Sequence, residues 1–363
     1  MAKRFIIAGG GTGGHIFPAV AIANALKKED AATDILFVGA KGKMEMEKVP
    51  QAGYKIQGLD IAGFNRSSLI KNIGLPWKLV KSFMQVRQIV NEFKPDGVIG
   101  VGGYSSFPML RYAQAQGIPT FIHESNSFAG KSNILLGKKA TKIFVATDGM
   151  EKFFPAEKIV ITGNPIRPQI ANINDVNKEE ALQAFGLQHG KQTVLAVGGS
   201  LGAKSINEAL EKDLDDLVQN DLQLIWQTGK TEAARWKESA KGKRGIWVAD
   251  FITNMEQAYA AADMVVSRSG AMAVAELCAV QKPVLFVPYP FAAEDHQTVN
   301  AGTLVQKGAA LMVKDGEAKD KIVPTIIELA KDSGKRNELK INISKYALQN
   351  ADEHIKEEIL RSI

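Results

Sequence analysis

The run Gly9-Gly10-Gly11-Thr12-Gly13-Gly14 follows the apolar stretch Phe5–Ala8, and helical periodicity begins directly after it. Half a chain later, Gly198-Gly199-Ser200-Leu201-Gly202 follows Val194–Val197 and again precedes a helical pattern. A strand that turns through glycine into a helix presents backbone N–H groups at the positive end of the helix dipole, which suits a phosphate. Two such turns predict two Rossmann-like halves that face one another across a cleft.

Apolar runs typical of strands alternate with helical patterns along nearly the whole chain, which predicts a parallel α/β architecture. In the first half we expect strands near 4–8, 35–38, 55–59, 97–101, 120–123, 142–146 and 158–163. In the second half we expect them near 193–197, 222–226, 245–248, 264–267, 283–287 and 310–313. The stretch 164–177 holds prolines and asparagines without periodicity, which is typical of a linker. We therefore predict domains at 1–163 and 164–342, followed by an amphipathic helical tail at about 343–363.

Length and composition limit the class of protein. The chain has 363 residues, a net charge of +6 and one cysteine, Cys278, which excludes an internal disulfide and fits a reducing cytoplasm. No stretch approaches the roughly 18 apolar residues that span a bilayer. The five histidines are scattered, and Asp213-Leu214-Asp215 lies among other charges as on a solvated helix face, so no metal site is expected.

The excess of positive charge is local. Between Asp60 and Glu92 there is no acidic residue, whereas Arg66, Lys71, Lys78, Lys81 and Arg87 all fall there. Nucleic acid and an anionic membrane surface are both partners that such a segment could take. Apolar side chains alternate with these cations: Leu69, Ile70, Ile73, Leu75, Trp77, Leu79, Val80, Phe83 and Met84. A core helix would carry mixed charge outside, so cations alone favour an interfacial helix on anionic lipid.

The first glycine run also matches the dinucleotide pattern G-x-G-x-x-G at Gly9, Gly11 and Gly14. That function needs an acidic residue at the end of the second strand to hold the ribose hydroxyls. Here the strand ends in Gly39-Ala40-Lys41, with no acid. The pattern therefore disfavours a nicotinamide or flavin enzyme.

Polar residues follow the strands of the first half. His15 should lie in the first turn of a helix, where the positive helix end keeps the ring neutral and able to accept a proton from a hydroxyl. Gly102–Pro108 forms a third glycine turn, and His123-Glu124-Ser125-Asn126 ends the next strand. Packing, helix capping or an ordinary turn would also explain each of these residues.

Polar residues also open two helices of the second half. Arg268-Ser269-Gly270-Ala271 precedes a helix that carries Glu276, whose carboxylate could accept hydrogen bonds from two ribose hydroxyls. Asp295–Asn300 opens the next helix with side chains suited to hydroxyls and amides. A solvated helix face is the alternative for Glu276.

Together these residues resemble the MurG-type N-acetylglucosaminyltransferases of glycosyltransferase family 28, which form lipid II in peptidoglycan synthesis. The resemblance covers nearly the whole chain, from Gly9–His15 through Gly102–Pro108, 123–126, 163–167, 198–203, 268–271 and 295–301. It implies the GT-B fold: two Rossmann-like parallel-sheet domains separated by a deep cleft, with the C-terminal helix crossing back to the first domain. It further implies an inverting transfer from UDP-N-acetylglucosamine to the C4 hydroxyl of a polyprenyl-diphospho-muramoyl acceptor.

The resemblance assigns roles residue by residue. Ser200 and the helix opened by Ala271 hold the diphosphate, the backbone at Ile252 faces the uracil, and Glu276 takes the ribose. Gln297 and Asn300 hold the sugar, and first-domain residues and Arg167 close over the donor. The donor residues are Thr12, Gly13, Gly14, Asn126, Arg167, Ser200, Ile252, Ala271, Met272, Ala273, Val274, Ala275, Glu276, Gln297 and Asn300. Ala273 departs from the family, whose relatives carry a hydroxyl residue there, so one phosphate contact is missing.

The resemblance places the acceptor diphosphate on the first domain, at Gly103, Tyr104 and Ser105. His15 is the leading base for the C4 hydroxyl, with Glu124 the second candidate. Leu75, Trp77, Lys78, Leu79, Lys81 and Phe83 are the expected membrane residues. We expect no tightly bound cofactor, with a divalent cation at most assisting turnover, no nucleic acid, and a peripheral place on the cytoplasmic face of the bacterial cell membrane. A transferase with another lipid acceptor, a UDP-sugar epimerase and a nucleic-acid-binding module are the alternatives.

Overall fold

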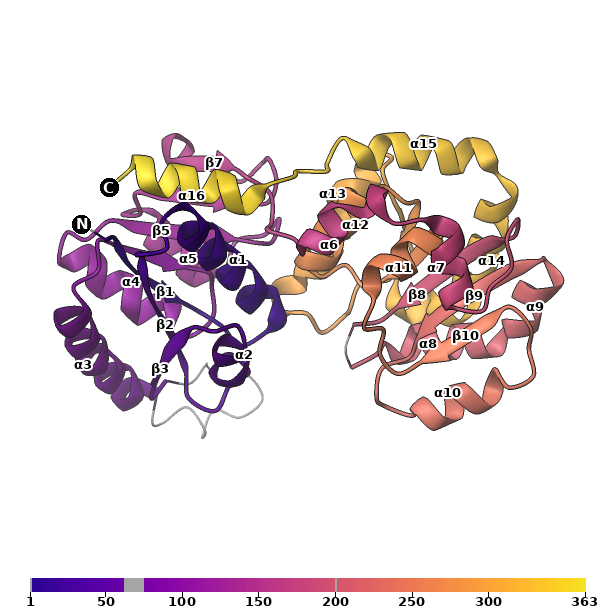
Figure 1. Cartoon of the computed structure of the whole chain (residues 1–363), viewed down its shortest axis with the longest axis horizontal. Coiled ribbons are helices and arrows are strands. Elements are labelled where there is room, and N and C mark those ends of the chain that lie inside the picture. Colours follow the sequence, from indigo (N-terminus) through magenta and orange to yellow (C-terminus); the bar gives the residue numbers. More distant parts are fainter. Residues whose placement is uncertain (1, 62–74, 200) are drawn as a thin grey trace. The chain divides into compact units, whose positions relative to one another are not determined.

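The computed structural model describes residues 2–61, 75–199 and 201–363. The chain divides into two compact units (Figure 1): Met1–Ile166 with Gln349–Ile363, and Arg167–Leu348. We expected the division after residue 163 and the tail from about residue 343. Ser200 and residues 62–74, which include Arg66 and Lys71, lie outside the described residues.

A parallel sheet forms the centre of the first unit. Its strands are β1 (Arg4–Ala8), β2 (Asp34–Ala40), β3 (Lys55–Leu59), β4 (Gly97–Gly100), β5 (Thr120–Glu124), β6 (Lys142–Val145) and β7 (Ile159–Ile161). They pair in the order β3-β2-β1-β4-β5-β6-β7. The helices are α1 (Gly13–Glu29), α2 (Glu45–Gln51), α3 (Leu75–Phe93), α4 (Ser106–Ala115), α5 (Lys131–Gly137) and α16 (Ala351–Arg361).

Strand β1 shows why this sheet needs helices on both faces. Successive side chains of a strand point to opposite faces. Phe5 and Ile7 pack in one apolar core with residues of α1 and α16, whereas Ile6 and Ala8 pack in another with residues of α3 and α4. The continuous apolar run that predicted a strand is therefore explained by burial on both sides.

The second unit repeats this plan. Its strands are β8 (Gln192–Val197), β9 (Leu222–Gln227), β10 (Ile246–Ala249), β11 (Met264–Ser267), β12 (Val284–Phe286) and β13 (Leu311–Met312), in the parallel order β10-β9-β8-β11-β12-β13. Its helices are α6 (Pro168–Ala171), α7 (Lys178–Ala184), α8 (Lys204–Lys212), α9 (Leu214–Gln219), α10 (Ala233–Ser239), α11 (Met255–Ala261), α12 (Ala271–Val280), α13 (His296–Gln306), α14 (Ala318–Lys331) and α15 (Ser333–Ser344). The predicted α/β class with two Rossmann-like sheets is confirmed.

The expected linker is partly helical. Within 164–177, Pro168 opens α6, as proline often does at the first helical position, and Ile170 is buried. Helix α6 packs on α12 of the same unit. The absence of periodicity in this stretch therefore reflects a helix too short to show it.

The tail also divides between the units. Leu339 of α15 belongs to the core of the second unit, whereas Ile355 and Ile359 of α16 pack in the first unit beside α1. At the edge of that contact, Lys356 donates to Glu29 at 2.8 Å. None of the helices in the described ranges is long and apolar enough to cross a membrane.

Candidate functional site

A cavity of about 830 Å³ opens in the second unit at the carboxyl ends of its central strands. The glycine turn after β8, Ile252 and the start of α12 form its walls. Ligands of open parallel sheets bind at this end, because the loops that follow the strands gather there. Arg167, Ile252, Ala273, Glu276 and Gln297, which sequence analysis assigned to the donor, line it.

The glycine turn of this unit is shaped by close backbone packing. Gly202 has φ +82°, and a Cβ there would lie 2.0 Å from the carbonyl oxygen of Thr228. Gln227, at the end of β9, donates to the Gly199 carbonyl at 3.0 Å and accepts from the Ile252 N–H at 3.0 Å. One buried amide thus ties the turn to the opposite wall. Sequence analysis missed Gln227, although its position at the end of a strand was available as a signal.

Two helices begin at this cavity. Neither α8, after Ala203, nor α12, after Gly270, has a side-chain cap, and residues of both helix starts line the cavity. The N-terminal end of a helix carries the positive end of its dipole, so these two helix starts suit an anion in the cavity. Ala271, Met272, Val274 and Ala275 form the half-buried first turns of α12 behind Ala273.

Arg167 and Glu276 form a two-bonded ion pair in the wall of the cavity. Arg167 Nε donates to Glu276 Oε1 and Nη2 donates to Oε2, both at 2.9 Å. Burial by itself lowers the pKa of Arg167, but the hydrogen bonds and charge of Glu276 outweigh it and raise that pKa. The hydroxyl of Tyr259 also donates to Glu276 Oε2, at 3.5 Å. Arg167 therefore lies in the second unit, beside the residue predicted to hold the ribose.

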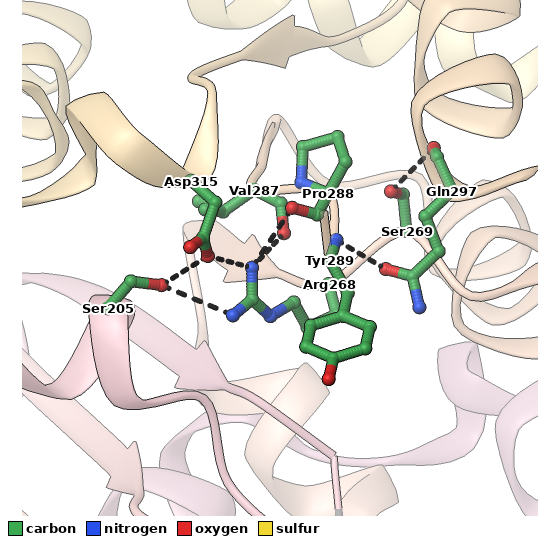
Figure 2. A network of polar contacts seen from close by, with 8 residues as sticks. All are labelled: Ser205, Arg268, Ser269, Val287, Pro288, Tyr289, Gln297 and Asp315. Carbon is green, nitrogen blue, oxygen red and sulfur yellow. Dashed lines mark hydrogen bonds and ion pairs between the residues drawn. The ribbon is translucent and has the colours of Figure 1, made fainter. Parts of the chain in front are cut away.

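A second polar network, drawn in Figure 2, holds Arg268. Its Nη1 donates to Asp315 Oδ1 at 2.5 Å and to the carbonyls of Val287 and Pro288, and its Nη2 donates to Ser205 at 3.2 Å. Ser205 also donates to Asp315 at 2.5 Å. Four segments distant in sequence are thereby joined around one guanidinium. Asp315 follows a two-residue strand, and no sequence motif indicated it.

Gln297 and Asn300, both on α13, take different positions. Gln297 lines the cavity and accepts from the Tyr289 N–H at 3.0 Å through its side-chain oxygen (Figure 2). Asn300 is buried and donates to the Ser269 carbonyl at 3.1 Å, outside the cavity lining. Gln297 is thus placed to meet a ligand, whereas Asn300 supports the loop before α12.

In the first unit, two glycine turns pack against each other. Gly10 donates its N–H to the Gly102 carbonyl at 3.1 Å. A Cβ on Gly103 would lie 2.5 Å from the Gly10 carbonyl oxygen, and one on Gly102 would lie 2.7 Å from Cε1 of His15. The imidazole of His15 therefore lies directly on the turn after β4. Thr12, Gly13 and Gly14 open α1 beside it, and Thr12 makes no side-chain cap.

Several buried polar side chains surround this place. Ser105, Ser106 and Ser125 have buried hydroxyl oxygens without a hydrogen-bond partner among the described residues. Neither ring nitrogen of His123 has a partner of normal geometry there. Burial, and then the nearby His15, lower the pKa of His123 to about 4. Because buried polar groups are normally satisfied, this cluster is suited to a polar ligand or ordered water. Tyr104 beside it is 47% exposed.

Glu124 is already fully engaged. Its Oε1 accepts from the backbone and side chain of Asn126 at 3.1 and 3.3 Å. Its Oε2 accepts from the Gly130 N–H at 3.1 Å and from Asn133 at 2.9 Å. Four donors fill the usual acceptor sites of a carboxylate. The geometry thus suits Glu124 to holding the loop 125–133 in place.

Helix α3 changes character along its length. Trp77 is 71% exposed, and Leu79, Val80 and Met84 are exposed as well, next to Lys78 and Lys81. Phe83 is half-buried, and the later residues Val86, Ile89 and Val90 join the core. Lys81 pairs with Asp60 at 3.0 Å. The helix is therefore a core element at its end and an apolar, basic surface at its start.

Within the described ranges, no group of three or more histidine, cysteine, aspartate or glutamate side chains is arranged to hold a metal ion. The sites described above are thus built from backbone amides, hydroxyls, amide side chains, ion pairs and histidines.

Two Rossmann-like units with a cavity at the strand ends define the class of GT-B glycosyltransferases and their structural neighbours. The model of the glycosyltransferase family 28 N-terminal domain matches residues 5–145, and that of the family 28 C-terminal domain matches residues 193–357. The chain belongs to glycosyltransferase family 28.

Three proteins similar to this chain show which members of the fold class it resembles in sequence and which in fold alone. A Parabacteroides distasonis protein named UDP-N-acetylglucosamine--N-acetylmuramyl-(pentapeptide) pyrophosphoryl-undecaprenol N-acetylglucosamine transferase is 51% identical, covering 99% of this chain and 98% of its own. The crystal structure of Acinetobacter baumannii MurG is similar with a TM-score of 0.81 at 28% identity, covering 99% of each chain. A UDP-GlcNAc 2-epimerase from Neisseria meningitidis, with a TM-score of 0.67 at 15% identity and covering 99% of this chain and all of its own, shares the fold alone.

Proposed function

We propose that the chain transfers N-acetylglucosamine from UDP-N-acetylglucosamine to the C4 hydroxyl of undecaprenyl-diphospho-N-acetylmuramoyl-pentapeptide. The products are lipid II and UDP, and the new linkage is β-1,4. The relative at 51% identity is named as an N-acetylglucosamine transferase for UDP-N-acetylglucosamine and N-acetylmuramyl-(pentapeptide) pyrophosphoryl-undecaprenol. The observation that carries the proposal is the cavity onto which the starts of α8 and α12 open, since transfer moves negative charge onto the leaving diphosphate and a helix start carries a positive dipole end.

UDP-N-acetylglucosamine occupies this cavity in the proposal. The amides at the starts of α8 and α12 stabilise its diphosphate, a kind of aimed donor worth about 3–4 kcal/mol in a transition state. Glu276 accepts a ribose hydroxyl at Oε1, because Arg167 takes one acceptor site of each oxygen and Tyr259 takes the second site of Oε2. The side-chain N–H groups of Gln297, which donate to no residue that the structure describes, meet the sugar.

The acceptor binds the first unit. Its diphosphate meets the start of α1 and the loop at Gly103, Tyr104 and Ser105, where buried hydroxyls lack partners among the described residues. His15 lies on this loop and removes the proton from the C4 hydroxyl as it attacks the anomeric carbon. Glu124 positions the loop that carries Asn126, since its four bonds leave no free acceptor site. Attack from the face opposite UDP inverts the α-linked donor.

The start of α3 binds the membrane surface. Trp77, Leu79 and Val80 are apolar and exposed beside Lys78 and Lys81, a combination suited to anionic headgroups. This surface would keep the protein at the membrane in which its polyprenyl-linked acceptor lies. Trp77→Ser should reduce binding to vesicles that contain anionic phospholipid, with Trp247→Ser of the second unit's β10 as an aromatic control. Equal binding by both variants would remove α3 from the interface.

UDP release tests the proposed transfer. Purified protein should release UDP from UDP-N-acetylglucosamine when the polyprenyl-diphospho-muramoylpentapeptide acceptor is present and not when it is absent. A muramoyl-free polyprenyl phosphate serves as the control for another lipid acceptor. Release with the control alone would reject the proposed acceptor, and conversion of the donor without any acceptor would indicate an epimerase or hydrolase.

A further inference from the structure

Glu45 places a carboxylate inside the first glycine turn. It is the first residue of α2 and is only 2% exposed. Its Oε2 accepts from the Gly11 N–H at 2.7 Å, and its Oε1 accepts from the Ala40 N–H at 2.9 Å. Both of its hydrogen-bond partners among the described residues are backbone amides, so a buried negative charge is held by the turn itself.

The glycines of this region leave room for that side chain. A Cβ at Gly10 would lie 2.3 Å from the carboxyl carbon of Glu45, and one at Gly39 would lie 2.5 Å from its Cγ. Any larger residue at these positions would displace the carboxylate. Gly10 and Gly39 are therefore needed to make room for the Glu45 side chain as well as to form the backbone around it.

The backbone N–H groups of the turn before α1 therefore already have hydrogen-bond acceptors within the protein. Gly9 donates to the Val38 carbonyl and Gly10 to the Gly102 carbonyl, both at 3.1 Å, while Gly11 donates to Glu45. A phosphate at this turn would have to displace the Gly11 bond and lie against a buried charge of the same sign. Like charges at short range inside a protein repel strongly.

The second glycine turn differs in this respect. In the described part of that turn, the side chain that contacts the backbone is the neutral amide of Gln227, which donates to the Gly199 carbonyl. The helix start beyond it opens onto the 830 Å³ cavity. Both turns are glycine-rich and lie between a strand and a helix, but only the first is described with a carboxylate, that of Glu45, on its backbone.

We propose that Glu45 is a specificity-determining residue: its carboxylate keeps phosphate groups out of the first glycine turn and so confines the nucleoside diphosphate to the second unit. The acceptor diphosphate then meets the amides beyond Gly11, at the start of α1 and after β4. The inference rests on the proposed function, which places the donor in the second unit. Its test measures binding and does not require the glycosyl transfer reaction.

The test measures binding of inorganic pyrophosphate by calorimetry to the full chain saturated with UDP. Glu45→Gln keeps the size of the side chain and removes its charge, and it should bind pyrophosphate at least tenfold more tightly than the wild-type chain. Glu47→Gln, which removes an exposed carboxylate of the same helix, should match the wild type. A folded Glu45→Gln chain that binds pyrophosphate no better than wild type overturns the proposal.

A second variant covers loss of folding. Glu45→Ser leaves the space of the carboxylate empty, so in chains saturated with UDP pyrophosphate should raise its thermal unfolding temperature by several degrees more than that of the wild type. No such rise overturns the proposal as well. The UDP titration used for saturation tests the donor cavity separately, so failure of the proposed function would be seen as loss of UDP binding.

Discussion

The glycine turn of the first unit and that of the second differ in what surrounds their backbone amides. In the first, the N–H groups of Gly9, Gly10 and Gly11 all have acceptors within the protein. In the second, a turn held by Gln227 leads to a helix start on an open cavity. The backbone amides of a glycine-rich turn between a strand and a helix can thus be bound by the protein's own acceptors, or the turn can lead to a ligand cavity. Its sequence alone does not distinguish the two cases.

The first unit should supply the base and the second the leaving-group site. His15→Ala should therefore lower kcat by about a hundredfold to ten-thousandfold, the usual contribution of a positioned base, while UDP affinity stays close to wild type. Single-turnover rates and UDP titration measure the two quantities. A rate within tenfold of wild type would exclude His15 as the base, and an equal loss in UDP affinity would move it to the donor site.

The first unit also carries a buried histidine that should make it sensitive to acid. The pKa of His123 is lowered to about 4 by burial and by His15, whereas the unfolded chain takes up the proton near pH 6.5. The free energy of unfolding therefore depends little on His123 above pH 6.5. It decreases as the pH falls from 6.5 toward 4, because only the unfolded chain binds the proton in that range. Over that range the loss amounts to roughly 3 kcal/mol, at 1.36 kcal/mol per pKa unit.

Chemical unfolding of the wild type and of His123→Asn between pH 7.5 and 4.5 measures this difference. The variant should lose less stability over the range, because asparagine does not titrate. Parallel pH dependence of the two proteins would show that another group causes the acid sensitivity.

In the second unit, Glu276→Ala should raise the KM for UDP-N-acetylglucosamine by about tenfold to a hundredfold, since hydrogen bonds to a charged group contribute about 1.5–3 kcal/mol. Glu256→Ala is a matched control, because the charge of that carboxylate also raises the pKa of Arg167 but its side chain does not line the cavity. An unchanged KM in Glu276→Ala would remove this residue from the ribose.

The smallest effect concerns the second turn itself. Leu201 is 77% exposed on that turn, and Leu201→Glu would give it a carboxylate, as the first turn has. UDP affinity should fall by about tenfold at low salt, the effect of about 1.4 kcal/mol of charge repulsion. Leu201→Gln separates charge from size. Equal affinities for the two variants would mean that charge at the turn does not select its ligand.

The sequence was sufficient for the parallel α/β class, because apolar runs such as Phe5–Ala8 are buried on both faces of a sheet. It also indicated the glycine turns and several cavity residues, because these follow strand ends. It could not show that Arg167 pairs with Glu276, 109 residues away, since such contacts depend on tertiary packing.

Glu45 illustrates the same limit more closely. A search for an acid at the end of β2 found none, because the sequence there is Gly39-Ala40-Lys41. The carboxylate comes instead from the start of α2 and reaches back to the Ala40 amide. Position along the chain thus concealed a carboxylate that contacts the end of β2 in the folded structure. For Asp315, which joins Arg268 and Ser205, no local pattern offered a signal.

Helix α16 has a practical consequence for dissecting the protein. Ile355 and Ile359 complete an apolar core that includes Ile22 and Leu26, which lie more than three hundred positions earlier in the chain. A fragment cut at Ile166 would lack α16 and expose to solvent the apolar side chains that this helix covers. Autonomous expression of the N-terminal half therefore calls for residues 349–363 to be grafted onto it or added as a separate peptide.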